Sequence, residues 1–167
     1  GGLQVEQASV TTNNTDLYGV TAGYINMNEK GTLSATCAEG AEVPAPIRVL
    51  DGGAFYVAKD ATVTGTAWAD NVTGEGSGAV TILTSVASIG DTKYATLEDA
   101  VEGATENDMI QLLRDVTLSE KLTIDKAITL EGNNNTITGK SDSTEVYFEI
   151  TGGTFTISNA KLTGFGD

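Results

Sequence analysis

Short runs in which apolar and polar residues alternate make up most of this 167-residue chain, and Gly, Asn and Asp residues separate the runs. Alternation with a period of two places successive side chains on opposite faces, which is the pattern of a half-buried strand. Asp51-Gly52 is the only Asn-Gly or Asp-Gly pair, so the usual signal for two-residue hairpins is nearly absent. We therefore predict an all-β fold whose strands pair from coil to coil rather than in a hairpin meander.

A gap-free repeat runs through the first half of the chain. Residues 23–36 align on residues 53–66, and a shorter echo of the pattern occupies residues 152–164. The matched positions are Ile25 with Phe55, Met27 with Val57, Thr32 with Thr62, and Leu33 with Val63. Each copy reads as Gly, alternating apolar residues, a polar turn and a second short strand, which favours a stack of similar coils.

The second half shows a shorter period. The apolar pair Ile110 and Leu112 recurs as Ile128 and Leu130 and again as Phe148 and Ile150, while Ile137 recurs as Ile157. Such short strands bury their apolar faces only when one coil stacks on the next. We therefore predict an inward column of Leu112, Leu130 and Ile150. The turn residues Asn133 to Asn135 should adopt left-handed conformations or form an amide ladder with a neighbouring coil.

One short helix is predicted at residues 97–104. Thr96 is a candidate N-cap with Asp99 three residues later, and Leu97, Ala100, Val101 and Ala104 follow at helical spacing. Because this helix precedes the first periodic strand, we expect it to cover the end of the coil stack and protect its edge.

Three of these segments together resemble the sequence pattern of a known family. The runs 94–101, 107–112 and 122–132 combine a capping helix, a turn ending in Asp108, a strand, and coils reading apolar-x-apolar before Gly132. The combination resembles the start of pectin-lyase-like right-handed parallel β-helices. Residues 89–94 are similar to the lead-in of large surface proteins of gut Firmicutes. The resemblance covers residues 89–164 and implies a right-handed parallel β-helix from at least residue 89 to residue 167, with an N-terminal capping helix.

Residues 1–88 form a separate β-rich module. Pro44 and Pro46 interrupt it, because proline does not fit a central strand. Two alternatives remain, further β-helix coils with a repeat of about 30 residues or a small sandwich, and the repeat favours coils. We place the boundary near Ser88–Gly90. The second module, 89–167, holds about three coils and shows no C-terminal cap, so we expect self-association through an open last coil, or further coils beyond Asp167.

Charge and composition narrow the classes of function. The chain has 9 Lys and Arg against 23 Asp and Glu, a net charge of -14, which opposes binding to nucleic acid and to anionic membranes. The absence of His removes Ser-His hydrolases and His-ligated zinc. The single Cys37 cannot form an intrachain disulfide, and we expect a buried side chain there. No apolar run is long enough for a membrane span.

The residue pattern contains no motif that is typical of a catalytic site or of a metal site. Active enzymes of the resembled family gather Asp, Arg, Lys or His on one coil face, whereas Arg48 and Arg114 are the only arginines here. The 23 acids leave carboxylate pairs possible, but no spacing singles one out. Oxygen-bearing residues near turns lack calcium-loop spacing, so we expect solvated turns and no cofactor or metal. These turn residues are Asp60, Asp70, Asn71 and Asn133 to Asn135.

A carbohydrate or a surface protein of a host or another bacterium is the partner we expect. Trp68, Tyr56 and Tyr24 are the candidate glycan platform, with filling of the core or an edge as the alternative. The leading hypothesis is a non-catalytic structural and adhesive module of an extracellular bacterial surface protein, whose export signal and wall anchor lie outside these residues. The alternative is a fragment of a carbohydrate-active β-helix enzyme whose catalytic coils lie elsewhere.

Overall fold

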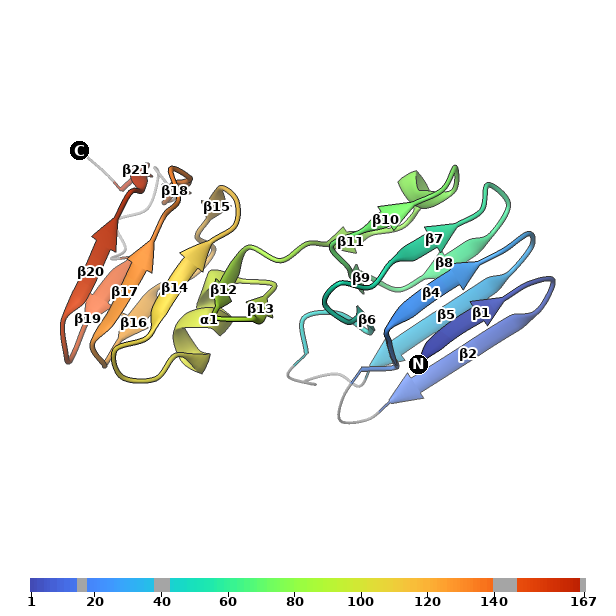
Figure 1. Cartoon of the computed structure of the whole chain (residues 1–167), viewed down its shortest axis with the longest axis horizontal. Helices are drawn as coiled ribbons and strands as arrows, with labels where there is room; N and C mark the ends of the chain where they lie inside the picture. Colours follow the sequence, from blue (N-terminus) through green and yellow to red (C-terminus); the bar gives the residue numbers. More distant parts are fainter. Residues whose placement is uncertain (15–17, 38–42, 140–146, 166–167) are drawn as a thin grey trace. The chain divides into compact units, whose positions relative to one another are not determined.

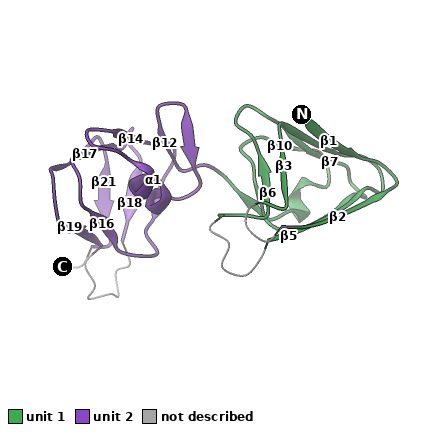
Figure 2. Ribbon diagram, turned by 90° about the horizontal axis from the view of Figure 1, so that it is seen from below, with its two compact units in different colours: residues 1–84 green, residues 85–167 purple. Residues whose placement is uncertain are grey.

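The computed structural model describes residues 1–14, 18–37, 43–139 and 147–165, and the chain forms two compact units. Unit 1 spans Gly1–Thr84 and unit 2 spans Ser85–Asp167 (Figure 2). In each unit, successive coils lay their strands in parallel beside those of the coil before. The predicted all-β, coil-stacked fold is therefore confirmed as a parallel β-solenoid, and unit 1 adopts the coils rather than the sandwich.

Three parallel sheets enclose the core of unit 1 (Figure 1). Sheet A has the strand order β1-β4-β7-β10, sheet B has β2-β5-β8, and sheet C has β11-β9-β6-β3. A short 3-10 helix, Ser77–Ala79, lies between β10 and β11. The strands are β1 (Gly2–Val5), β2 (Ser9–Asn14), β3 (Val20–Ala22), β4 (Tyr24–Met27), β5 (Thr32–Cys37), β6 (Ile47–Val49), β7 (Phe55–Val57), β8 (Thr62–Thr64), β9 (Ala67–Trp68), β10 (Val72–Thr73) and β11 (Ile82–Leu83).

The register of unit 1 confirms the repeat that begins at Gly23 and Gly53. All four matched pairs lie directly opposite each other: Ile25 with Phe55, Met27 with Val57, Thr32 with Thr62, and Leu33 with Val63. The apolar members point into a core in which Ile25, Met27, Leu33 and Phe55 are almost completely buried. Burial of these side chains is the main favourable term holding the coils together.

The glycine that begins each copy of the repeat is required by a close approach between coils. A Cβ at Gly53 would lie 2.0 Å from the carbonyl oxygen of Gly23, and a Cβ at Gly23 would lie 2.8 Å from the carbonyl oxygen of Gly1. Gly23 also donates a backbone hydrogen bond of 2.6 Å to that Gly1 oxygen. The glycines thus form a column in which each backbone packs directly on the next.

Unit 2 begins with an antiparallel hairpin and continues as a solenoid (Figure 1). Sheet D has the order β13-β12-β14-β17-β20, sheet E has β15-β18-β21, and sheet F pairs β16 with β19. In sheet D, β12 is antiparallel to both β13 and β14. The strands are β12 (Ala87–Ile89), β13 (Thr92–Tyr94), β14 (Met109–Leu112), β15 (Val116–Thr117), β16 (Leu122–Ile124), β17 (Ile128–Glu131), β18 (Thr136–Thr138), β19 (Phe148–Ile150), β20 (Phe155–Ser158) and β21 (Lys161–Thr163).

The inward column predicted for the second half is wrong in its register. Ile110 lies opposite Leu130, and Leu130 lies opposite Ile157, so the second step along the chain is longer than the first. Leu112 instead lies opposite Ala87 of the hairpin. The other displaced positions are Phe148 and Ile150, which pair with Leu122 and Ile124 in sheet F, and Ile137, which pairs with Leu162. A prediction with one constant repeat length gives the wrong register here, because successive coils of unit 2 differ in length.

The helix α1 occupies Leu97–Gly103, one residue shorter than predicted, with Ala104 as its C-cap. The Asp99 N–H donates to the Thr96 hydroxyl at 3.0 Å, which is the predicted N-cap. Leu97, Ala100 and Val101 join the core of unit 2. At the other end, the Lys126 ammonium donates to the carbonyl oxygens of Glu102 and Ala104, where a cation also complements the helix dipole.

The Asn133 to Asn135 turn behaves as predicted and joins two coils. Asn133 and Asn134 have positive φ angles of 50° and 66°. The side-chain amides of Asn133 and Asn135 donate to the carbonyl oxygen of Leu112 in the preceding coil. The amide side chains therefore satisfy a backbone acceptor that the strand ladder leaves over.

Two carboxylates of unit 2 hold further turns in place. The backbone N–H of Thr105, and then its hydroxyl, donate to Asp108 and lower the pKa of that carboxyl. The Ser158 hydroxyl, followed by the Asn133 N–H and the Asn159 amide, lowers the pKa of Glu131. Both carboxylates accept these bonds best in their charged form, so the bonds favour ionisation.

Unit 2 should lose stability as the pH falls. Because folding lowers the pKa of Asp108 and Glu131, their contribution is complete above the ordinary carboxyl range and is lost as the pH falls through it. We expect the melting temperature to decrease between roughly pH 6 and pH 3. The double variant Asp108→Asn/Glu131→Gln should melt lower at pH 6 and show a weaker pH dependence. Glu120→Gln, at an exposed side chain, is the control, and an unchanged pH profile in the double variant would contradict this prediction.

Candidate functional site

Two tyrosines stand on the outer face of sheet A in unit 1. Inward and outward residues alternate along each strand, so Tyr24 of β4 and Tyr56 of β7 both point away from the core. Their side chains are 51% and 42% exposed. Asn26 of β4 lies directly opposite Tyr56, which makes the two tyrosines diagonal neighbours on adjacent strands.

A groove of about 560 Å³ lies between these rings, lined by Tyr24, Ile25, Asn26, Asn28, Ala54 and Tyr56. We call it the tyrosine groove. Tyr24 lies over Gly2, because a Cβ at Gly2 would overlap its ring. The small Ala54 leaves the space beside Tyr56 open.

The polar groups of the tyrosine groove include an oxygen without a partner. The Asn26 side-chain oxygen is buried and accepts no hydrogen bond. Asn28 is held by the Glu6 carboxylate, to which its amide donates at 3.5 Å. A buried carbonyl oxygen without a donor costs free energy, and a ligand hydroxyl or amide would remove that cost. The groove therefore offers two aromatic faces, and the unsatisfied acceptor lies beneath its surface, where a ligand reaches it once the Asn26 side chain turns outward.

Trp68 lies on a different sheet from the two tyrosines. It belongs to β9 in sheet C, opposite Arg48 of β6, and is only 8% exposed. The Arg48 guanidinium lies 3.7 Å from the centre of the Trp68 ring, and it also pairs with Asp51. The structure thus brings Tyr24 and Tyr56 together as one candidate platform, whereas Trp68 takes part in a cation–π contact elsewhere.

The remaining candidates for chemistry serve structural contacts. Arg114 donates to the Ser85 carbonyl oxygen at 2.9 Å, and Asp115 accepts from the Thr136 N–H at 2.7 Å, which links two coils. Cys37 is a free thiol at the end of β5, half-exposed rather than buried as predicted, because the strand ends there. A groove in unit 2 gathers Glu98, Glu102, Glu120 and Asp125 beside Lys121 and Lys126. Within the described parts of the chain, no group of three or more Cys, Asp or Glu side chains is arranged to hold a metal ion.

Sequence reasoning missed the polar part of the tyrosine groove. The platform predicted from the sequence consisted of three aromatic residues and included neither Asn26 nor Asn28. The repeat of the first half contained the signal, because it places positions 24 and 26 beside positions 54 and 56 on one outer face. Aligning the outward residues, as well as the inward ones, would have brought Asn26 next to Tyr56.

Comparison with known proteins finds no matching family model, no similar curated protein and no similar solved structure. None of the helices in the described residues is long and apolar enough to cross a membrane. The coil-to-coil strand pairing establishes the fold as a parallel β-solenoid, and this fold by itself does not define a function.

Proposed function

We propose that this chain is a non-catalytic structural and adhesive module of an extracellular bacterial surface protein, and that it binds carbohydrate in the tyrosine groove. The observation that carries the proposal is the pair of exposed rings, Tyr24 and Tyr56, on either side of the unpaired Asn26 oxygen. Aromatic faces stack on the apolar C–H faces of sugar rings, and a hydroxyl of the sugar supplies the missing donor once the Asn26 side chain turns toward the groove.

The electrostatics of the groove favour a neutral sugar. No Lys or Arg is among the residues that line it, while the Glu6 carboxylate lies beside it through its bond to Asn28. The chain as a whole carries a net charge of -14. An acidic polysaccharide would meet like charge and find no cation to pair with, so uronic acid polymers are disfavoured as ligands.

The location of the module rests on sequence resemblance and composition. In sequence, residues 89–164 resemble the start of pectin-lyase-like right-handed β-helices, which carry an N-terminal capping helix, and residues 89–94 resemble the lead-in of large bacterial surface proteins. An acidic, repeat-built chain with a single Cys suits an exported bacterial protein. A polysaccharide depolymerisation assay separates this proposal from the carbohydrate-active enzyme alternative, since clear turnover by the chain would contradict a non-catalytic role.

Removing either ring should weaken binding to the glycan. A glycan array with the full chain identifies a neutral oligosaccharide, and calorimetry then compares variants. We expect Tyr24→Ala and Tyr56→Ala each to lose about tenfold in affinity, as for a ring at the centre of a small site. Tyr56→Phe keeps the stacking face and should retain most of the affinity. Met109→Ala, an equally exposed apolar residue in unit 2, is the control and should leave binding unchanged.

Binding that survives the loss of both tyrosines would place the ligand elsewhere on the chain. An array on which no neutral glycan binds would overturn the proposed function.

A further inference from the structure

The Tyr24 ring stands well away from the strand that carries Tyr56. Tyr24 lies opposite Gly2 of β1, and a Cβ at Gly2 would lie only 2.1, 2.2 and 2.4 Å from three carbon atoms of the Tyr24 ring. The ring therefore leans over β1. Tyr56 belongs to β7, and β4 lies between β1 and β7 in sheet A. Because neighbouring strands are about 4.8 Å apart, the ring of Tyr24 and the backbone of Tyr56 are separated by roughly 10 Å.

The surface between the two rings is low and uncharged. Asn26 lies opposite Tyr56, and Ala54 takes the corresponding place opposite Tyr24. Both side chains are shorter than tyrosine, so they form the floor of the tyrosine groove rather than a wall. At about 560 Å³, the groove has the volume of sites for drug-sized ligands, which are larger than a single sugar. It therefore has room for a further sugar between the two rings.

Neutral residues continue across the sheet beside the two rings. Gln4 of β1 lies opposite Asn26, and Thr73 of β10 lies opposite Tyr56; both are exposed. The Glu6 carboxylate belongs to a residue that follows the end of β1. A ligand that runs across the strands at the level of the tyrosines therefore meets hydroxyl and amide groups, which exchange hydrogen bonds with sugar hydroxyls.

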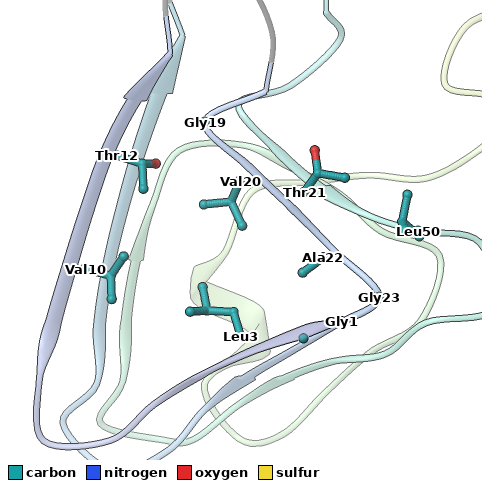
Figure 3. A pocket seen from close by; sticks show the side chains of 11 residues that line it. Gly1, Leu3, Val10, Thr12, Gly19, Val20, Thr21, Ala22, Gly23 and Leu50 are labelled. Carbon is teal, nitrogen blue, oxygen red and sulfur yellow. The ribbon is translucent and has the colours of Figure 1, made fainter.

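A second hollow of unit 1 lacks the surfaces that stack on a sugar. It has a volume of about 460 Å³, and Figure 3 shows Leu3, Val10 and Val20 pointing into it. These side chains are aliphatic, and no aromatic ring is among the described residues that line the hollow. Because sugar faces stack on aromatic rings, we place the glycan in the tyrosine groove and not in this hollow.

We infer that the tyrosine groove binds at least three consecutive sugars of an extended chain of neutral pyranoses joined by β-1,4 linkages. The first sugar stacks on Tyr24, the third stacks on Tyr56, and the middle one lies above Asn26 and Ala54. A single pyranose ring is too short to touch both tyrosines across roughly 10 Å. This inference rests on the proposed binding of carbohydrate and adds the length and the shape of the ligand.

The shape of the sugar chain follows from the position of both tyrosines on one face of sheet A. In β-1,4-linked chains of glucose, N-acetylglucosamine or mannose, both bonds that leave each ring are equatorial, so successive rings form a straight ribbon. The first and the third ring then face the same way and can rest on two platforms of one face. An α-1,4-linked chain curves instead, which lifts its third sugar away from Tyr56. Equatorial substituents also leave C–H bonds on the ring faces, where aromatic rings stack.

Calorimetry with oligosaccharides of increasing length tests the span of the site. The probes are β-1,4-linked oligomers of glucose, of N-acetylglucosamine and of mannose, each with two to five units. In a series that binds, we expect the trisaccharide to bind about tenfold more tightly than the disaccharide, because only the trisaccharide reaches both rings. The longer oligomers should gain little more, since Tyr24 and Tyr56 are the two aromatic residues that line the groove.

Tyr24→Ala should remove this dependence on length. Without that ring, the sugar at one end of the trisaccharide has no platform, so the trisaccharide should lose about tenfold in affinity and bind nearly as the disaccharide does. The disaccharide should lose little, because it can still stack on Tyr56. Comparing two ligands in two forms of the chain is a double-mutant cycle, and it isolates the contact between the terminal sugar and Tyr24.

Ala54→Phe tests the place of the middle sugar. The new ring would rise from the floor of the groove between the tyrosines, so trisaccharide binding should fall by about tenfold or more. Ala54 is exposed, so the fold should survive, and circular dichroism confirms this before affinities are compared. Thr64→Phe is the matched control. Thr64 is exposed on β8 of sheet B, and this variant should bind the trisaccharide like the unaltered chain.

Four outcomes would overturn this inference and leave carbohydrate binding in place. They are equal affinities for the disaccharide and the trisaccharide, a dependence on length that persists in Tyr24→Ala, unchanged trisaccharide binding in Ala54→Phe, and tighter binding of maltotriose than of any β-1,4-linked trisaccharide. Binding of another neutral glycan from the array, with no binding of the three β-1,4-linked series, would overturn it as well. Failure of the proposed function differs from all of these, because then no neutral glycan binds.

Discussion

Replacing Leu130 with Asp should unfold unit 2. Leu130 is 1% exposed and stacks between Ile110 and Ile157, so its carboxylate would be buried among apolar side chains with no cation nearby. The lost packing and the unpaired charge together cost about 5 kcal/mol or more. A unit of this size has a total stability of about 4–12 kcal/mol, so the variant should lack a cooperative transition for unit 2.

Hydrogen exchange read out over β14 and β17 measures this effect within unit 2. Thr129→Asp is the matched control. Thr129 is the residue before Leu130 in β17, and it points outward between Met109 and Thr156. We expect Thr129→Asp to cost less than about 1 kcal/mol. Equal protection of β14 and β17 in Leu130→Asp and in the unaltered chain would show that this column is not inside the core.

Gly53→Ala should destabilise unit 1 far more than its single added methyl group suggests. The new Cβ would lie 2.0 Å from the Gly23 carbonyl oxygen, and the nearest obstacle is backbone that cannot rotate away. The two coils must separate locally, which weakens the ladder between β4 and β7. Overpacking of this kind costs about 3 kcal/mol.

Gly78→Ala provides the control for this effect. A Cβ there meets no atom within 4 Å, and the position lies in the same unit. Chemical denaturation should give a clear loss of unfolding free energy for Gly53→Ala and almost none for Gly78→Ala. If the two variants unfold alike, the glycine column does not set the distance between coils.

The sequence predicted unit 1 more accurately than unit 2 for a physical reason. The coils that begin at Gly23 and Gly53 have strands and corners of equal length, so a gap-free alignment reproduces the true register. In unit 2 the step from Leu130 to Ile157 is longer than the step from Ile110 to Leu130, and the inward Leu112 pairs with a hairpin rather than with the next coil. That hairpin turns at Gly90-Asp91, a weaker signal than Asp-Gly.

Local chemistry explains the remaining successes and failures. The helix was predicted within one residue because Thr96 and Asp99 specify its start through a hydrogen bond between neighbours in sequence. The sequence identified the two tyrosines as candidate glycan-binding residues. Their meeting in one groove, and the separation of Trp68 from them, depends on which sheet each strand joins. That assignment requires the corner lengths, which composition and alternation do not provide.

The glycine column and the coil-to-coil ladders also determine how each unit would respond to mechanical load. Within a unit, the backbone hydrogen bonds between coils run along the stacking axis, so tension along that axis loads one strand pair at a time. Under this tension the hydrogen bonds between two neighbouring coils break one after another, at a lower force than when two strands are pulled past each other along their length. Each released coil of roughly 20–30 residues adds ~70–100 Å of extended chain. Each unit should therefore lengthen coil by coil under load rather than all at once.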